Sequence, residues 1–181
     1  MIGKCTAFLQ YTFFYTMFPA SQPVIHTERL ILRQLNAEDA EDLFALRSNP
    51  AVNRYINRNP ETSAEGTLAF IEKINGNIAQ QKSLYWGISP LSSGKLAGTI
   101  CLWNFSADGW RVEIGYELLP AYQGRGWMQE AAAAVIDFAS GSLGLKMISA
   151  LVQKENLSSV RVLKKLGFHH DTAYSIMSEE E

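Results

Sequence analysis

A glycine-rich turn between a strand and a helix is the feature of this sequence best suited to chemistry. Residues 111–119 have the pattern of a strand, Gln123-Gly124-Arg125-Gly126 form the turn, and 127–140 have the pattern of a helix. In this order, backbone N–H groups and the positive end of the helix dipole converge on one point, which suits an anion such as a phosphate. A tight connection without any ligand has the same pattern, so the turn alone leaves both interpretations open.

The turn matches neither of the two common nucleotide-binding motifs. Gln129 stands where the third glycine of G-x-G-x-x-G would fall, and no G-K-[ST] follows as in a P-loop. The run Gln123-Gly124-Arg125-Gly126-Trp127-Met128 instead resembles the acetyl-coenzyme A signature Q/R-x-x-G-x-G/A of the GNAT acyltransferases, although Met128 replaces the small last residue. Gly126-Trp127-Met128-Gln129-Glu130-Ala131 is similar to the form found in the RimJ/RimL ribosomal-protein N-acetyltransferase branch.

Three further segments resemble that branch in the same order along the chain. Residues 26–33 are similar to its opening strand, 113–118 to its fourth strand, and 155–168 to its N-x-x-S and K-L-G-F segment. The resemblance implies the GNAT fold, an α/β (α+β) domain. Its sheet is mixed but mostly antiparallel, is flanked by helices, and has fourth and fifth strands that splay apart around the cofactor.

The resemblance also implies a role for each matched position. Acetyl-CoA would be the co-substrate, with its pyrophosphate on the backbone N–H groups of the turn and an added cation from Arg125. A free N–H near Leu118 or Leu119 would polarise the thioester carbonyl. Asn156 would contact the pantetheine arm, and Ser159 would protonate the departing thiolate. The cofactor-binding positions implied in this way are Leu118, Leu119, Gln123, Gly124, Arg125, Gly126, Trp127, Met128 and Asn156.

A general base is needed because an attacking amine arrives as an ammonium ion. Glu113 is the first candidate, and Glu117, four residues further along the same strand face, is the second. Each of these side chains also has a purely structural interpretation. A carboxylate on a strand face is often simply solvated, and Asn156 is a natural N-cap for the helix that follows it.

Hydrophobic spacing and turn residues predict the elements that position these groups. We expect strands at 29–35, 84–89, 95–103 and 111–119, and helices at 36–49, 62–81 and 127–140. Asn36 is the expected cap of the first helix, Thr62-Ser63-Ala64-Glu65 is a capping box, and Ser92-Ser93-Gly94 supplies a hairpin turn. Without a repeat or linker, residues 26–181 are expected to form one acetyltransferase domain. Residues 1–25 are an apolar extension outside the resemblance.

Composition excludes several classes of function. The chain has 181 residues with 16 basic and 18 acidic side chains and no basic stripe, so a role in nucleic-acid binding is not expected. Cys5 and Cys101 show neither C-x-x-C spacing nor a neighbouring His cluster, which argues against a disulfide scaffold or a metal site and favours a cytoplasmic setting. Cys101 lies in a hydrophobic strand pattern typical of core packing, so direct attack is favoured over a covalent enzyme intermediate.

The two ends of the sequence depart from the apparent family. Only 13 residues follow Phe168, and they leave room for about one strand, where the family has two. The strand at 145–152 would then have an exposed edge, which proteins usually cover. One explanation is a truncated or frameshifted product. The other is that the aromatic run 8–18 pairs with 145–152, in the same chain or in a dimer mate.

The sequence thus predicts an enzyme that moves acetyl from acetyl-CoA to a primary amine, as a monomer or homodimer. The expected acceptor is a protein N-terminus, such as that of a ribosomal protein, or a small amine such as a polyamine, an amino acid or an aminoglycoside. The alternative is a catalytically impaired acyl-CoA-binding module that acts as a sensor or scaffold. The aromatic N-terminal run is too short to span a membrane and lacks a basic face, so stable membrane insertion is not expected.

Overall fold

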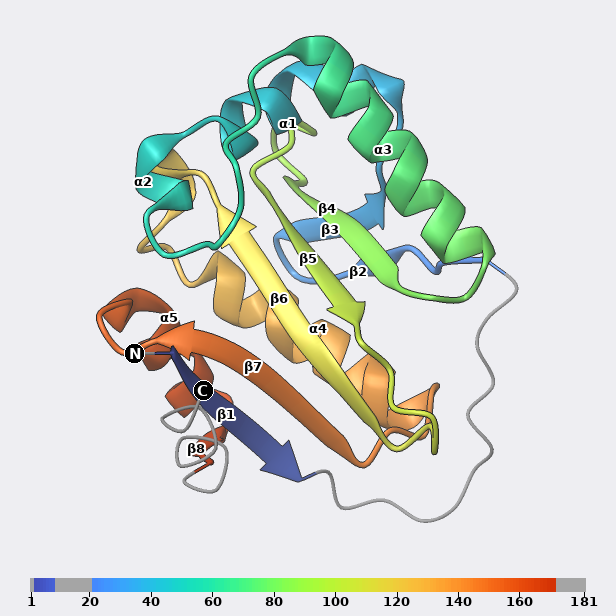
Figure 1. Ribbon diagram of the computed structural model, residues 1–181, viewed down its shortest axis with the longest axis vertical. Coiled ribbons are helices and arrows are strands. Elements are labelled where there is room, and N and C mark those ends of the chain that lie inside the picture. Colours follow the sequence, from blue (N-terminus) through green and yellow to red (C-terminus); the bar gives the residue numbers. More distant parts are fainter. Residues whose placement is uncertain (1, 9–20, 172–181) are drawn as a thin grey trace.

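The computed structural model describes residues 2–8 and 21–171. In this part of the chain eight strands form one sheet in the order β2-β3-β4-β5-β6-β7-β1-β8 (Figure 1). The strands are β1 (Ile2–Phe8), β2 (Ile25–His26), β3 (Leu30–Gln34), β4 (Leu84–Pro90), β5 (Gly98–Trp103), β6 (Arg111–Leu118), β7 (Met147–Gln153) and β8 (His169–His170). The helices are α1 (Ala40–Arg47), α2 (Pro50–Asn53), α3 (Ala64–Ala79), α4 (Trp127–Gly141) and α5 (Leu157–Lys165), with short 3-10 turns at Ala37–Asp39 and Pro120–Tyr122.

The sheet is mixed, and its one parallel pair has a topological cause. Neighbouring strands of the described sheet run antiparallel except β6 and β7, which are parallel. The chain leaves β6, crosses one face of the sheet as α4, and re-enters as β7, and a crossover of this kind yields a parallel pair. The predicted mixed, mostly antiparallel sheet flanked by helices is confirmed.

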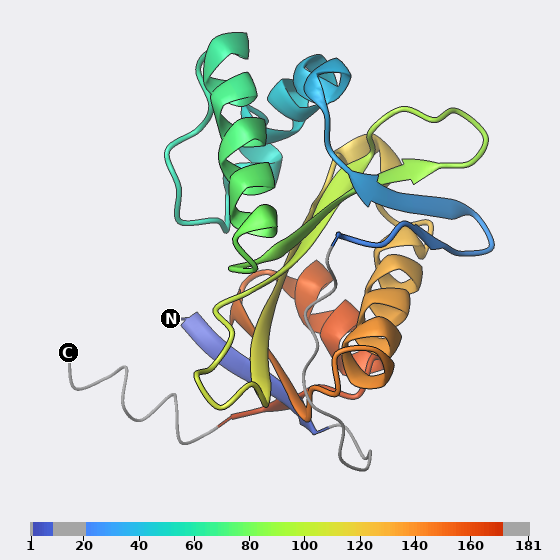
Figure 2. The ribbon, with the colours of Figure 1, turned by 90° about the vertical axis from the view of Figure 1, so that its right-hand side faces the viewer.

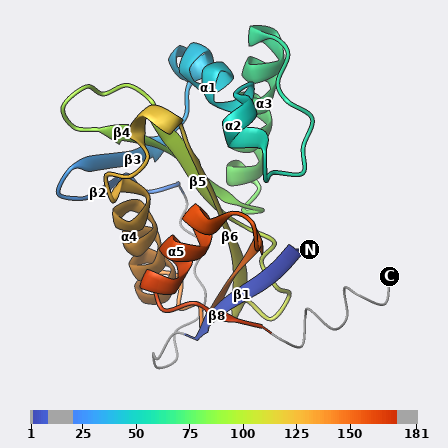
Figure 3. The same cartoon turned by 90° about the vertical axis from the view of Figure 1, so that its left-hand side faces the viewer.

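Helices cover both faces of the sheet. Helices α4 and α5 pack on one face and α3 lies on the other (Figures 2 and 3). The apolar stripe of α4 is buried against the strands, and it is made of Met128, Ala131, Ala132, Val135 and Ala139. Because this stripe ends in Met128 at the first turn, core packing fixes the N-terminus of α4 on the sheet. None of the helices in the described residues combines the length and apolar character that a membrane crossing needs.

Two predicted helices differ in detail from the structure. The helix expected from Asn36 through residue 49 does start at its predicted cap, Asn36, but it consists of a 3-10 turn followed by α1. A further short helix, α2, then begins at Pro50 with Asn49 as its cap. Proline suits that position since the first helical N–H has no intrahelical partner. Ser63, rather than Thr62, is the N-cap of α3, and its hydroxyl accepts a hydrogen bond from a first-turn amide at 3.0 Å.

The N-terminal segment contributes a strand to the sheet. β1 lies antiparallel to β7, from Ile2 opposite Gln153 to Phe8 opposite Met147, and β8 pairs with its outer edge. The edge of β7 is therefore covered from within the chain by residues 2–8, of which Phe8 alone belongs to the expected run 8–18. Residues 9–18 lie outside the described part of the chain.

Candidate active site

The strands β6 and β7 separate after a short paired stretch. Their parallel register runs only from Arg111 opposite Met147 to Glu113 opposite Ser149 among the described residues. Beyond that point β6 stays paired with β5 and β7 with β1. The predicted splay is thus present. A small cavity lies between the diverging strands, lined by residues that include Tyr116 and Val152.

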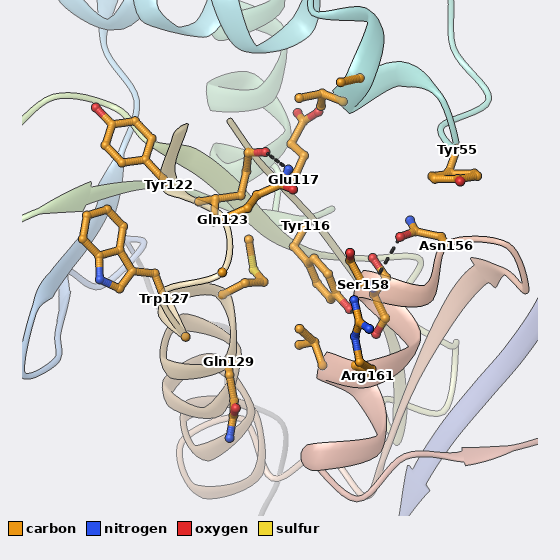
Figure 4. A pocket seen from close by; sticks show the side chains of 18 of the residues that line it. Tyr55, Tyr116, Glu117, Tyr122, Gln123, Trp127, Gln129, Asn156, Ser158 and Arg161 are labelled. Atoms are coloured by element: carbon orange, nitrogen blue, oxygen red, sulfur yellow. Dashed lines mark hydrogen bonds between the residues drawn. The ribbon is translucent and has the colours of Figure 1, made fainter. Parts of the chain in front are cut away.

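A larger cavity of about 380 Å³ adjoins this gap. Figure 4 shows Tyr122, Gln123 and Trp127 on one side and Asn156, Ser158 and Arg161 on the other. The cavity brings together most of the predicted site residues, namely Leu118, Gln123, Gly124, Gly126, Trp127, Met128, Asn156 and Ser159. Glu113, Leu119 and Arg125 are not among its lining residues.

Only one of the two predicted backbone donors points into the gap. The Leu119 N–H donates to the Ala97 carbonyl at 2.9 Å, so it extends the β5–β6 ladder. Because successive residues of a strand direct their N–H groups to opposite edges, the Leu118 N–H faces the gap between β6 and β7. The Leu118 carbonyl accepts a hydrogen bond from the Gln123 side-chain amide at 2.8 Å, which ties the turn to the end of β6.

The turn has the backbone geometry that its glycines predict. Gly124 has φ +76° and Gly126 has φ +78°, which is the left-handed region that favours glycine. Gly126 is the N-cap of α4 and no side chain caps this helix, so the first-turn N–H groups are left for water or a ligand. Beside the turn, the rings of Tyr122 and Trp127 stack at 5.4 Å. This arrangement can hold a phosphate group on backbone amides.

A carboxylate on α4 joins the turn to the opening strand segment. Glu130 accepts hydrogen bonds from the Thr27 hydroxyl at 2.6 Å and from the Arg29 backbone N–H at 2.9 Å, and it forms an ion pair with the Arg29 guanidinium at 2.6 Å. The same guanidinium donates to the Arg125 carbonyl at 3.1 Å. The Arg125 carbonyl thus helps to hold Arg29, while the Arg125 guanidinium lies over the ring of Trp127, and its role as an added cation for the phosphate stays a prediction.

Glu130→Gln is expected to lower stability at neutral pH and to lose this effect in acid. Burial of the carboxylate raises its pKa, but hydrogen bonds from Thr27 and Arg29 outweigh burial and bring the pKa of Glu130 below its ordinary value of 4.5. A lowered folded-state pKa gives stability that is present above the unfolded-state pKa and is lost as pH falls through the folded-state value. Urea unfolding of both proteins at pH 7 and near pH 3 checks this, and a difference that stays constant with pH would contradict it.

The start of α5 faces the turn across the cavity. Asn156 is the N-cap of α5, since its side-chain oxygen accepts the Ser159 N–H at 3.2 Å, so its structural interpretation is confirmed. Asn156 and Ser159 line both cavities. The Tyr116 hydroxyl donates to the Ser159 carbonyl at 3.4 Å, and burial raises the pKa of Tyr116, so this phenol stays protonated at neutral pH.

The two candidate bases have different surroundings. Glu113 accepts a hydrogen bond from Asn104 at 2.7 Å and lies at the paired end of β6, outside the lining of either cavity. Glu117 lines the larger cavity, but both its oxygens are bound by Arg58, at 3.1 and 2.6 Å. The contacts therefore give no support to Glu113, and the role of either carboxylate as a base stays a prediction.

Several residues that line the cavity were not singled out by any motif in the sequence. Tyr55 and Ile56, which follow α2, line both cavities and carry no recognisable motif. Arg161 and Lys165 line the larger cavity from α5. Their spacing of one helical turn from each other, on the helix that Asn156 caps, is a signal that could have indicated a cationic face.

Cys101 is unsuited to act as a nucleophile. It lies outside both cavities, and burial raises the pKa of its thiol to about 12, so the reactive thiolate is scarce at neutral pH. Within residues 2–8 and 21–171, no group of three or more His, Cys, Asp or Glu side chains is placed to hold a metal ion.

Splayed parallel strands, a glycine turn before an uncapped helix and a second helix start facing it define a class of protein. Such an arrangement suits a long ligand that carries a phosphate group. A family model described as "Acetyltransferase (GNAT) domain" matches residues 29–169, so the chain belongs to this family. It is an acetyl-CoA-dependent acyltransferase, and the predicted superfamily is confirmed.

Proteins that are similar to this chain match it over most of their length. The chain is 34% identical over 149 residues to the uncharacterized N-acetyltransferase YoaA of Bacillus subtilis (strain 168), a match that covers 82% of this chain and 84% of that protein. A GNAT-family acetyltransferase from Bacillus anthracis has a crystal structure with a TM-score of 0.71 and 28% identity, over 80% of this chain and 82% of that one. RimL, a ribosomal L7/L12 alpha-N-protein acetyltransferase solved with coenzyme A, has a similar fold, with a TM-score of 0.72, 19% identity and coverage of 79% and 82%.

Proposed function

We propose that this enzyme acetylates the α-amine of a protein or peptide N-terminus by direct attack on acetyl-CoA. One observation carries the choice of acceptor. Among the described residues that line the two cavities, Glu117 is the single carboxylate, and Arg58 occupies both of its oxygens. The part of the site built by residues 2–8 and 21–171 therefore offers an incoming ammonium ion no free carboxylate to pair with or to take its proton.

At such a site, part of the acceptor amine must already be in its neutral form at the working pH. An α-amino group has a pKa near 8, so about 10% of it is neutral at pH 7, whereas an alkylamine with a pKa near 10.4 is about 0.04% neutral. The reactive form of an N-terminal amine is thus about two hundred times more abundant than that of a polyamine or lysine at equal concentration. This difference favours an N-terminal amine over the small alkylamines left open by the sequence.

The proposed reaction assigns a task to each part of the site. The Gln123 N–H donates to the Pro120 carbonyl at 3.2 Å, so the amides from Gly124 to Met128 hold the pyrophosphate, and Asn156 holds the pantetheine arm. The amine nitrogen bonds to the thioester carbon, and the Leu118 N–H stabilises the oxyanion that develops. The carbon–sulfur bond then breaks, the sulfur takes a proton from the Ser159 hydroxyl, and the nitrogen loses its extra proton to water. Solvent returns a proton to Ser159, so the products are an N-acetyl amide and free CoA.

Thiol release from acetyl-CoA, measured against a panel of amines, tests the proposed acceptor. A short peptide with a free N-terminus and no lysine should release CoA at pH 7, while the same peptide with an acetylated N-terminus and one lysine should not. Between pH 7 and pH 9 the rate with spermidine should rise about a hundredfold, and that with the peptide only about tenfold, following the neutral fractions. Faster turnover of spermidine than of the peptide at pH 7 would overturn the proposed acceptor. No release with any amine would favour the sensor alternative.

A further inference from the structure

The segment Tyr55–Asn59, here called the acceptor loop, lies over the gap between β6 and β7. Its first two residues, Tyr55 and Ile56, line both the large and the small cavity. Its backbone hydrogen bonds are local: the Ile56 N–H donates to the Asn53 carbonyl and the Arg58 N–H to the Ile56 carbonyl. These bonds shape the loop but do not attach it to the sheet.

Ile56 packs against a core cluster that includes Val52 and Leu96, and the Arg58 side chain adds a polar contact to the sheet. Two of its N–H groups donate to the two oxygens of Glu117 on β6, at 3.1 and 2.6 Å, and its Nε donates to the Asn53 side-chain oxygen at 2.8 Å. The Arg58 and Glu117 side chains are 17% and 6% exposed, so this forked contact is largely withdrawn from water. A planar, two-bond contact of this kind fixes orientation as well as distance.

The Glu117 carboxylate also accepts a hydrogen bond from a neighbouring strand of the sheet. The Thr99 hydroxyl on β5 donates to one Glu117 oxygen at 3.2 Å, and the Tyr85 hydroxyl on β4 donates to Thr99 at 3.0 Å. Three side-chain N–H or O–H groups therefore bind this carboxylate. A carboxylate so bound is built to hold a neighbouring element in place, and Glu117 directly precedes Leu118, whose N–H faces the gap.

We propose that Arg58 and Glu117 are a positioning pair that sets the acceptor loop against the Leu118 N–H and thereby determines how the acceptor amine is bound. This inference rests on the proposed function, because it assigns the loop to the acceptor side of the same site. The cofactor side, built from the turn before α4 and the start of α5, makes no contact with Arg58 among the hydrogen bonds of the described residues. Loss of the pair should therefore change acceptor binding and leave CoA binding intact.

Kinetics of Arg58→Ala and Glu117→Gln test the pair. Each variant should raise the KM for the acceptor peptide about tenfold or more, since a displacement near 1 Å is costly in an enzyme site, while the CoA dissociation constant stays within about twofold of wild type. The double variant should show no larger rise than either single one, because both remove the same contact. Arg58→Lys, which keeps the charge but loses the fork, should fall between wild type and Arg58→Ala. Lys73→Ala, on the exposed surface of α3, removes one positive charge elsewhere and should leave both constants unchanged.

Amide hydrogen exchange separates this inference from the proposed function. In folded Arg58→Ala, exchange should accelerate in residues 55–59 and stay unchanged in α4 and α5. If wild type releases no CoA with any amine, the proposed function fails while this measurement still decides whether the pair holds the loop. Unchanged exchange and unchanged acceptor KM, or a loss of CoA affinity equal to the rise in acceptor KM, would overturn the inference. Should Arg58→Ala fail to fold, Thr99→Val weakens the same carboxylate contact more mildly and should shift the same two measurements in the same direction.

Discussion

Gly126→Val is expected to weaken CoA binding by about tenfold or more. Gly126 has φ +78° and is the N-cap of α4. A side chain in this left-handed region costs about 1–2 kcal/mol, and more for a β-branched residue. The turn should therefore relax to another conformation, and binding would have to restore the original one, at a cost equivalent to about tenfold in affinity. Calorimetric titration with CoA measures the change.

Gly141→Ala is the matched control for this substitution. Gly141 ends the same helix, has no positive φ, and a Cβ placed there meets no atom within 4 Å. Its affinity for CoA should equal that of wild type. A folded Gly126→Val protein that binds CoA as tightly as Gly141→Ala would remove the argument that the turn holds the pyrophosphate.

The turn and the caps could be predicted from the sequence because their causes are local. Gly124 and Gly126 are required by φ angles within the turn itself, and Asn156 caps the helix that begins beside it. The apolar stripe of α4 likewise follows from helical spacing alone. Where two capping residues were adjacent, as at Thr62 and Ser63, the pattern could not decide between them, and the expected start was wrong by one residue.

Contacts between distant segments could not be predicted in this way. Arg29 and Glu130 belong to two segments that both resemble the family, but they lie 101 residues apart, and nothing in either segment indicates that they meet. The choice between Glu113 and Glu117 as the first candidate base also depends on contacts between distant segments. Both share one strand face, and they differ in that β6 is still paired with β7 at Glu113 but not at Glu117. Only the point of separation of the strands puts Glu117 at the cavity.

The acceptor loop shows a further limit of local patterns. Tyr55 and Ile56 carry no motif. The loop is held by packing of Ile56 on the core and by a side-chain contact between Arg58 and Glu117, which are 59 residues apart. The acceptor side of the site is thus determined by tertiary contacts, whereas the cofactor side is determined mostly by local backbone geometry. This difference explains why the sequence indicates the cofactor more clearly than the acceptor.

Cys5→Pro is expected to lower the free energy of unfolding by about 1–3 kcal/mol relative to Cys5→Ala. The Lys4 carbonyl accepts the Asp171 N–H, so the backbone polar groups of Lys4 point away from β7. Those of the next residue, Cys5, therefore point toward β7, where Cys5 lies opposite Ala150. Proline has no N–H to donate, so a buried acceptor on β7 loses its partner. Cys5→Ala removes the same thiol but keeps the N–H, and urea unfolding of the two variants isolates the backbone contribution.

The effect should extend to the cofactor site because β1 pairs with the half of β7 that is no longer paired with β6. From Ala150 to Gln153, β7 is paired with β1 on one side and borders the gap on the other. Loss of the β1 ladder should therefore let this wall of the cavity move and weaken CoA binding in Cys5→Pro but not in Cys5→Ala. The expectation that residues 8–18 form the covering strand makes the opposite prediction, that Phe14→Pro destabilises the protein and Cys5→Pro does not. Equal stabilities of Cys5→Pro and Cys5→Ala would contradict the inference that pairing of residues 2–8 with β7 stabilises this side of the gap.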